Sequence, residues 1–216
     1  MTTENEMLQQ AQEFIEKGDS EAAVQLAKQA LEQGIDGIAL LNKGFIPGIN
    51  KVGDLFGEGQ LFLPELIMSA NAMQGVIEII NQALEKTGQK QVKGKVVIGT
   101  VEGDLHDIGK TIVVSLLKAN GFEVRDLGRD VSVERFIEEA ETFEANIIGT
   151  SALLTTTMSV QKDLEEKLKE KGLKGKFKTV VGGAPVTERW AKRIGADAYA
   201  ADATDGVRKI KELMAE

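Results

Sequence analysis

From residue 95 onward, short β-branched runs alternate five times with longer amphipathic stretches, and this alternation constrains the fold more than any other feature. The runs predict strands at 96–101, 123–127, 146–151, 178–181 and 198–200. The intervening stretches predict helices at 110–120, 133–143, 156–171, 187–194 and 205–213. Five such units predict an α/β domain built on a doubly wound, parallel, five-stranded sheet. Sheets of this kind bind ligands at the carboxyl ends of their strands, near the point where the strand order reverses.

The first 88 residues show only helical periodicity, in four apolar stretches. Pro64 suits the first turn of the fourth helix, whereas we expect Pro47 to break or kink the third helix because proline lacks the N–H donor. The pattern predicts an all-α four-helix bundle over residues 1–88. The polar, glycine-containing stretch 89–94 predicts a linker, which leaves residues 95–216 as the second domain.

Composition excludes several classes of function. The formal net charge is -8, so the sequence predicts neither a nucleic-acid partner nor binding to acidic lipid. There is no cysteine, which rules out disulfides, thiolate metal sites and cysteine nucleophiles. The N-terminus lacks the basic and apolar regions of a signal peptide, and no uncharged apolar run approaches the length of a membrane span. We therefore expect a cytoplasmic protein without a membrane partner.

The single histidine, His106, lies in the predicted loop after the first strand, within the segment Gly-Asp-Leu-His-Asp-Ile-Gly-Lys at 103–110. This segment looks like a phosphate-binding P-loop, but that motif needs four residues between its glycines and here there are five. Two aspartates in the loop would also repel a triphosphate. No G-x-G-x-x-G follows the first strand, so a dinucleotide is disfavoured as well.

A carboxylate at Asp104 can accept a hydrogen bond from one imidazole nitrogen of His106 and leave the other nitrogen as a metal ligand. A lone histidine cannot complete a zinc site, because no cysteine or second histidine is present. It can supply one axial ligand to a metal already held by a macrocycle. The alternative is a surface histidine that caps a helix.

Three separated motifs support the metal hypothesis. They are Asp104-x-His106-x-x-Gly109, Ser151-x-Leu153 after 41 residues, and Gly182-Gly183 after 28 more. Together they resemble the cobalamin-binding fingerprint. The two halves are similar to the cap and B12-binding modules of cobalamin-dependent methionine synthase and of small corrinoid methyl carriers. The resemblance implies a flavodoxin/Rossmann-like B12-binding domain over residues 95–216, preceded by a helical cap.

The resemblance also assigns roles to residues. His106 would be the lower axial ligand to the cobalt of methylcobalamin or a related corrinoid, bound base-off/His-on. Asp104 and Thr157 would form a relay behind it, with threonine standing where methionine synthase has serine. Phe56 and Leu63 would cover the upper face of the corrin. The implied cofactor-binding residues are Gly103, Asp104, Leu105, His106, Asp107, Ile108, Gly109, Ser151, Leu153, Thr155, Gly182, Gly183 and Ala203.

The implied function is to carry a methyl group on cobalt. The partners would be a substrate-specific methyltransferase, a second methyltransferase that delivers the methyl group to tetrahydrofolate or a thiol, and a reductive activase. The donor would be a methoxylated aromatic compound, as in an O-demethylase of one-carbon metabolism, or a methylamine. The chain alone is not expected to be a catalyst. Two alternatives are the B12-binding subunit of an adenosylcobalamin-dependent mutase and a B12-sensing regulator. The predicted helical cap argues against the mutase, which places a substrate barrel over the cofactor. The regulator usually carries a DNA-binding domain, for which this sequence shows no basic face.

Overall fold

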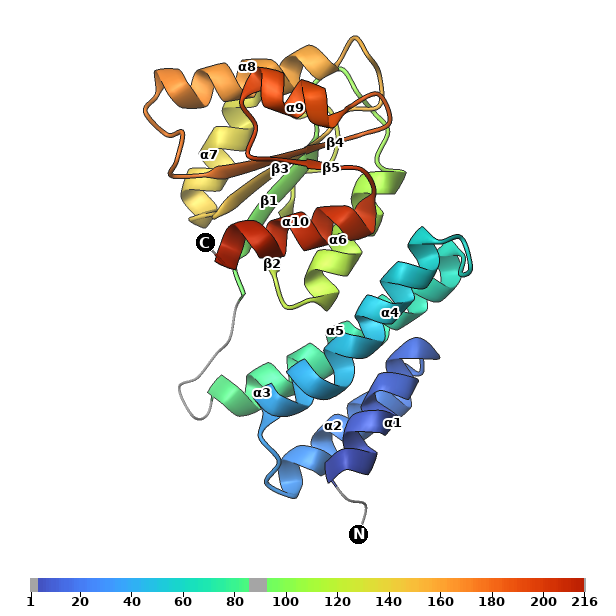
Figure 1. Ribbon diagram of the computed structural model, residues 1–216. Helices are drawn as coiled ribbons and strands as arrows, with labels where there is room; N and C mark the ends of the chain where they lie inside the picture. Colours follow the sequence, from blue (N-terminus) through green and yellow to red (C-terminus); the bar gives the residue numbers. More distant parts are fainter. Residues whose placement is uncertain (1–3, 86–92, 216) are drawn as a thin grey trace. The chain divides into compact units, whose positions relative to one another are not determined.

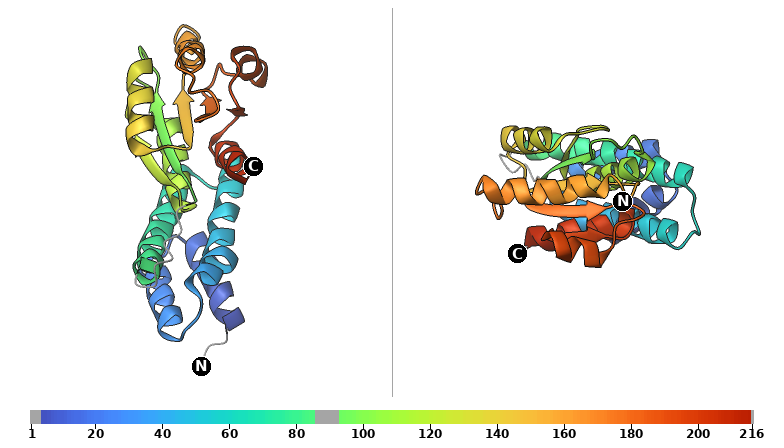
Figure 2. Two further views of the ribbon diagram at one scale, coloured as in Figure 1. Left: turned by 90° about the vertical axis from the view of Figure 1, so that its left-hand side faces the viewer. Right: turned by 90° about the horizontal axis from the view of Figure 1, so that it is seen from above.

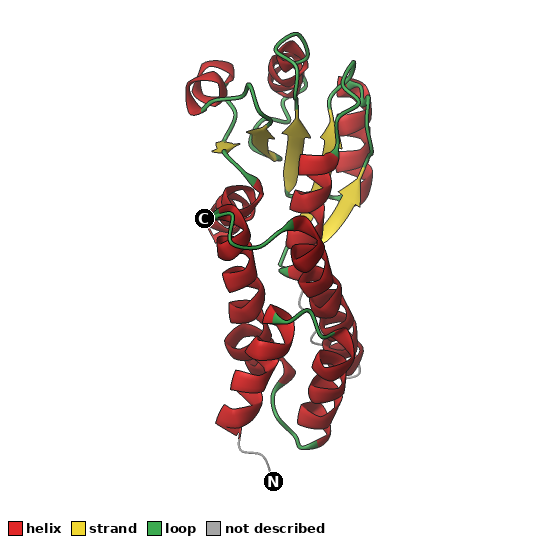
Figure 3. Cartoon of the chain, turned by 90° about the vertical axis from the view of Figure 1, so that its right-hand side faces the viewer, coloured by secondary structure: helices red, strands yellow, loops and turns green. Residues whose placement is uncertain are grey.

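The computed structural model describes residues 4–85 and 93–215, and the chain divides into two compact units close to residue 93 (Figure 1). The first unit contains helices only, whereas strands occur only in the second (Figure 3). Residues 89–92 of the predicted linker lie outside the described residues.

The N-terminal unit consists of four helical segments. They are α1 (Glu4–Glu16), α2 (Ser20–Glu32), the continuous run α3 (Gly37–Leu40), η1 (Leu41–Phe45) and α4 (Ile46–Gly57), and α5 (Leu63–Glu85). Their apolar faces bury side chains such as Met7, Ile15, Phe45, Met73 and Ile80. Although α5 has 23 residues, neither it nor any other described helix combines the length and apolarity needed to cross a membrane.

The third helical segment continues through Pro47. We expected this proline to break or kink the helix, but no break occurs, because the chain changes its hydrogen bonding. Residues 41–45 form a π-helical turn, and the Ile46 N–H donates to the Leu41 carbonyl five residues earlier. Pro47 follows at once in the first turn of α4. Pro47, which has no N–H to donate, therefore lies where the wider π-helical turn ends and α-helical hydrogen bonding resumes. The segment remains helical through this position.

The C-terminal unit is the predicted doubly wound domain. Its elements are β1 (Lys95–Thr100), α6 (Ile108–Ala119), β2 (Glu123–Asp126), α7 (Val133–Phe143), β3 (Ile147–Ser151), α8 (Met158–Glu170), β4 (Lys178–Gly182), α9 (Glu188–Ile194), β5 (Ala198–Ala200) and α10 (Ala203–Ala215). All strand pairs are parallel, in the order β2-β1-β3-β4-β5. The prediction of a five-stranded parallel sheet is confirmed.

Helices cover both faces of this sheet, α6 and α10 on one and α7, α8 and α9 on the other (Figures 1 and 2). The core on the second face contains Phe136, Leu164 and Phe177, packed against strand residues such as Ile148 and Val181. The chain leaves β1 toward β2 but later enters β3 on the other side of β1. The strand order therefore reverses between β1 and β3, which places the ligand-binding position of this fold class at the loops after those strands.

Candidate functional site

The loop between β1 and α6 carries His106 and is closed by its own hydrogen bonds. The Asp104 N–H donates to the Val101 carbonyl at 3.1 Å. The Thr100 hydroxyl, on the last residue of β1, donates to the His106 carbonyl at 3.0 Å. The end of the strand thereby fixes the backbone at both Asp104 and His106.

The Asp104 side chain is fully buried, and each of its oxygens binds a different loop. Oδ1 accepts from the His106 N–H at 3.1 Å and lies 2.7 Å from His106 Nδ1. Oδ2 accepts from the Leu153 N–H at 2.7 Å, the Leu154 N–H at 3.2 Å and the Thr157 hydroxyl at 2.9 Å. One carboxylate therefore joins the loop after β1 to the loop after β3 across the point where the strand order reverses.

These hydrogen bonds keep Asp104 ionised. Burial alone raises the pKa of its carboxyl, but the hydrogen bonds from the His106 side chain and backbone, the Leu153 backbone and the Thr157 hydroxyl together outweigh it. The pKa of Asp104 consequently lies well below its ordinary value. A fixed anion beside Nδ1 favours a proton on that nitrogen, so the neutral imidazole presents the lone pair of Nε2.

His106 itself points toward solvent, with 54% of its side chain exposed. No described residue forms a hydrogen bond with Nε2. Four large apolar side chains from these two loops and the start of α6 are also exposed, namely Leu105, Ile108, Leu153 and Leu154. An imidazole surrounded by exposed apolar side chains suits a flat, largely apolar ligand with a metal at its centre.

The possible metal ligands of the protein lead to the same type of ligand. Within residues 4–85 and 93–215, no group of three or more His, Cys, Asp or Glu side chains is placed to hold a metal ion. His106 can therefore act as one ligand to a metal whose other ligands come from a cofactor. A corrin macrocycle meets this condition, and the protein residues present fit it.

The predicted nucleotide-tail residues Ser151 and Gly182 lie side by side. Strand register places Thr100, Ser151, Gly182 and Ala200 in one row across β1, β3, β4 and β5. Ala200 Cβ faces Gly206 of α10, where an added Cβ would lie 3.4 Å away, so this row faces α10. Small side chains here let the helix approach the sheet closely at Ala200. Ala203 begins α10 at the same edge of the sheet, after β5.

The two glycines of the Gly182-Gly183 pair differ. Gly183 has φ +124°, and a Cβ there would lie 1.8 Å from the carbonyl oxygen of Ala152. At Gly182 the nearest atom would be 3.5 Å away, which is an ordinary contact. Only Gly183 therefore requires glycine, because the loop after β4 touches the backbone of the loop after β3.

The structure also places the remaining predicted residues of the two loops. Thr155 is exposed and forms no hydrogen bond with Asp104, His106 or Thr157 within the described chain. Gly103 has φ +79° and packs near the Thr157 methyl group, which an added Cβ would meet at 3.6 Å. Gly109 and Asp107 open the first turn of α6, and Gly109 has open space around it.

In the N-terminal unit, the predicted cap residues flank one loop. Phe56 lies at the end of α4 and Leu63 at the start of α5, and both are half-buried. The neighbouring Phe62 is 70% exposed and was not predicted as a functional residue. Its helical spacing gave no reason to separate it from the bundle core.

Sequence reasoning also missed three polar residues that support the site. Lys110 is buried and forms an ion pair with Asp126, so it is not free to bind a phosphate. The buried Gln161 donates to the carbonyls of Thr150 and Gly182 and so ties α8 to the ends of β3 and β4. Asp130 binds the His106 loop from the loop after β2. Their partners are distant in sequence, and no local pattern marks them.

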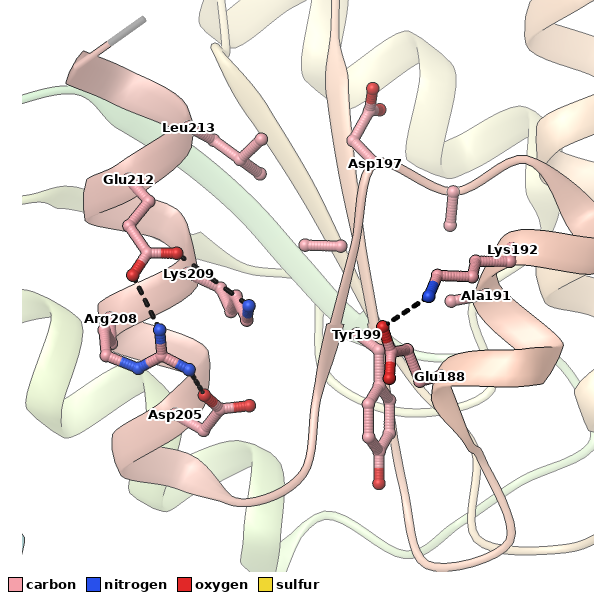
Figure 4. A pocket seen from close by; sticks show the side chains of 12 residues that line it. Glu188, Ala191, Lys192, Asp197, Tyr199, Asp205, Arg208, Lys209, Glu212 and Leu213 are labelled. Carbon is pink, nitrogen blue, oxygen red and sulfur yellow. Dashed lines mark hydrogen bonds and ion pairs between the residues drawn. The ribbon is translucent and has the colours of Figure 1, made fainter.

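A pocket of about 470 Å³ lies away from this site, between α9, β5 and α10 (Figure 4). Its charged side chains already pair with one another or with neighbours: Lys192 with Glu188, Arg208 with Asp205 and Glu212, and Asp197 with Lys174. It contains none of the predicted site residues, and its chemistry gives no reason to place the function there.

Comparison with known proteins decides the family. Residues 94–211 match the family described as B12 binding domain, and residues 7–81 match a second family of the same description. The chain belongs to the B12-binding corrinoid proteins. This corrinoid protein is 48% identical over 215 residues to trimethylamine corrinoid protein 1 of Methanosarcina mazei, covering 99% of this chain and 100% of the relative.

Two further relatives agree with this assignment. Dimethylamine corrinoid protein 1 of Methanosarcina mazei is 45% identical over 217 residues, covering 99% of each chain. A chain in the crystal structure of the methanol:cobalamin methyltransferase complex MtaBC from Methanosarcina barkeri superposes with a TM-score of 0.83 at 33% identity. That match covers 99% of this corrinoid protein and 81% of the other chain. The predicted family, fold class and corrinoid cofactor are confirmed.

Proposed function

We propose that this corrinoid protein serves as a methyl carrier between two methyltransferases, with His106 as the residue that would ligate the cobalt of the bound cofactor. The observation that carries the proposal is the buried Asp104 carboxylate, which holds Nδ1 of a lone, exposed histidine amid exposed apolar side chains. The bound cofactor supplies the methyl-carrying chemistry, and the protein supplies its binding and orientation.

Each part of the site then has a role. Asp104 orients the imidazole and raises the donor strength of Nε2, and Thr157 holds the far oxygen of Asp104. The Asp104–His106 pair can hold or release a proton at Nδ1 as the demand on Nε2 changes. The row of small residues containing Ser151 and Gly182 would accept the nucleotide tail of the cofactor. Residues 95–216 form the binding domain, and residues 1–88 form a cap that uses Phe56 and Leu63.

The methyl donor is best assigned to the methylamines. The two curated relatives named above carry trimethylamine and dimethylamine in their names, which favours an amine over a methoxylated aromatic donor. The first partner is then a methylamine-specific methyltransferase. The second passes the methyl group to a thiol or tetrahydrofolate, and a reductive activase restores the cofactor. The chain serves in the cytoplasm as a carrier and is not catalytic alone.

Removal of the imidazole tests the axial ligand. We expect wild-type protein reconstituted with methylcobalamin to show a base-off, histidine-ligated visible spectrum, and His106→Ala to lose that signature. Glu102→Ala, in the same loop and exposed, is the matched control and should keep the wild-type spectrum. Identical spectra for wild type and His106→Ala would remove His106 from the cobalt.

The donor is tested by methyl transfer. Reduced, cofactor-loaded protein is incubated with a methyltransferase and its methyl donor. The enzyme is either specific for trimethylamine or dimethylamine, or one that demethylates methoxylated aromatics. The visible spectrum of the corrinoid reports its methylation. We expect transfer with an amine and its enzyme and none with the aromatic ether. Loading from the aromatic ether alone would overturn the choice of donor.

A further inference from the structure

Asp130, in the loop after β2, makes two hydrogen bonds with the segment that precedes His106. Its Oδ1 accepts from the Gly103 N–H at 2.7 Å, and its own N–H donates to the Asp104 carbonyl at 3.1 Å. These are the peptide groups immediately before Gly103 and immediately after Asp104. Asp130 therefore clamps the backbone on both sides of the Gly103–Asp104 pair.

The loop that carries Asp130 is itself held against the end of β1. Val131 pairs with Val101 beyond the end of β1, and the Val131 N–H donates to the Thr100 carbonyl at 3.0 Å. The backbone of Asp130 is left-handed, with φ +55°, a conformation that costs free energy in any residue with a side chain. Aspartate is among the few residues that tolerate it. The loop thus holds Asp130 in a sparsely populated backbone conformation. In this conformation the carboxylate faces the Gly103 N–H and the Asp130 N–H faces the Asp104 carbonyl.

We propose that Asp130 is a positioning residue for His106, acting through Asp104. The inference rests on the proposed role of His106 as the cobalt ligand. Gly103, with φ +79°, is the pivot that sets the direction of the Asp104 side chain. By fixing the peptide groups around this pivot, Asp130 places the Asp104 carboxylate where one oxygen meets Nδ1 of His106 and the other meets Thr157.

The neighbouring Arg129 is a weaker candidate for this role. Its guanidinium reaches the Leu105 carbonyl at 3.4 Å and the Asp107 carboxylate at 3.6 Å. Neither contact bears on Asp104.

Two substitutions separate the clamp from a general effect on the fold. Asp130→Gly removes the carboxylate but accepts a positive φ, whereas Asp130→Asn keeps an acceptor oxygen and tolerates the same backbone. The side chain of Asp130 is exposed, so neither change disturbs the core. Asp130→Ser, whose oxygen is one bond shorter, replaces the glycine variant if that protein does not fold.

The first readout needs no cofactor. His106 is the only histidine, so long-range ¹H–¹⁵N NMR of the apoprotein shows one imidazole. We expect the neutral ring of the wild type and of Asp130→Asn to carry its proton on Nδ1, facing Asp104. We expect Asp130→Gly to lose that preference and shift toward the Nε2–H form that predominates in solvated histidine.

The second readout reports ligation. In ¹⁵N-labelled protein loaded with cob(II)alamin, electron paramagnetic resonance distinguishes a protein nitrogen on cobalt from the cofactor's own base. We expect the ¹⁵N splitting in wild type and in Asp130→Asn. In Asp130→Gly we expect part of the sample to lose the splitting, and the variant to bind cobalamin about 10-fold more weakly.

The outcomes separate the two proposals. If Asp130→Gly matches wild type in both readouts, or if Asp130→Asn loses as much as Asp130→Gly, the clamp is overturned. If the wild-type protein shows no ¹⁵N splitting, the axial role of His106 fails, and the imidazole tautomer alone then decides whether Asp130 positions the ring. A splitting that disappears in His106→Ala upholds the axial role whatever Asp130 does.

Discussion

Gly183→Ala is expected to destabilise the C-terminal unit by about 3 kcal/mol or more, the range of large single-residue effects. Two causes act together. The backbone at Gly183 has φ +124°, which side chains rarely adopt, and the new Cβ would lie 1.8 Å from the Ala152 carbonyl oxygen. That oxygen belongs to backbone at the end of β3, so it cannot move aside as a flexible side chain would. Relief of the overlap requires the loops after β3 and β4 to separate.

Gly182→Ala is the matched control, because it adds the same methyl group one residue earlier. The nearest atom to its Cβ is 3.5 Å away, and its backbone needs no glycine. We expect the free energy of unfolding of this variant, measured by urea titration, to stay within about 1 kcal/mol of wild type. Equal stability losses for the two variants would show that the Ala152 contact is not the cause.

Asp104→Ala is expected to weaken cobalamin binding by about 10- to 100-fold, the usual loss when the group that orients a metal ligand is removed. It also leaves donors of Leu153, Leu154 and Thr157 without their buried acceptor, and this should lower the free energy of unfolding by about 3 kcal/mol. Asp104→Asn, which keeps the size and one acceptor oxygen, should lose less stability.

The stability loss should depend on pH in a defined direction. The pKa of Asp104 is lower in the folded state than in the unfolded state, so its stabilisation is complete above the unfolded pKa of about 4 and decreases as the pH falls below it. Urea unfolding of wild type and Asp104→Ala at pH 7 and at pH 3 measures this. The difference between the two proteins should shrink at pH 3, and a difference that grows in acid would contradict a lowered pKa.

The sequence predicted the sheet well because parallel strands that are buried on both faces are near-continuous apolar runs, and most residues of 96–101 and 178–181 are β-branched. It also predicted the Asp104–His106 contact, since the two residues are neighbours in one loop. The contact of Asp104 with Thr157 spans 53 residues and came only from the resemblance. The loop geometry that sets it was not visible in the sequence.

Other features could not be predicted because they depend on the path of the backbone. The π-helical turn at 41–45 has no sequence signature, so Pro47 was expected to break or kink a helix that remains helical. Gly182 and Gly183 are the same residue type, and only the approach of Ala152 distinguishes them. Asp130 looks like an ordinary loop aspartate until its contact with Gly103 is seen.

The Thr157 hydroxyl lies 2.9 Å from two acceptors, Asp104 Oδ2 and the Leu154 carbonyl oxygen, but it carries a single hydrogen. The branched side chain restricts χ1, so Oγ1 stays in place while the hydrogen rotates. When the hydrogen turns toward Leu154, Asp104 Oδ2 keeps only the two backbone N–H donors of Leu153 and Leu154. The strength of the negative charge beside His106 can therefore change with the direction of one hydrogen atom, without displacement of any heavy atom.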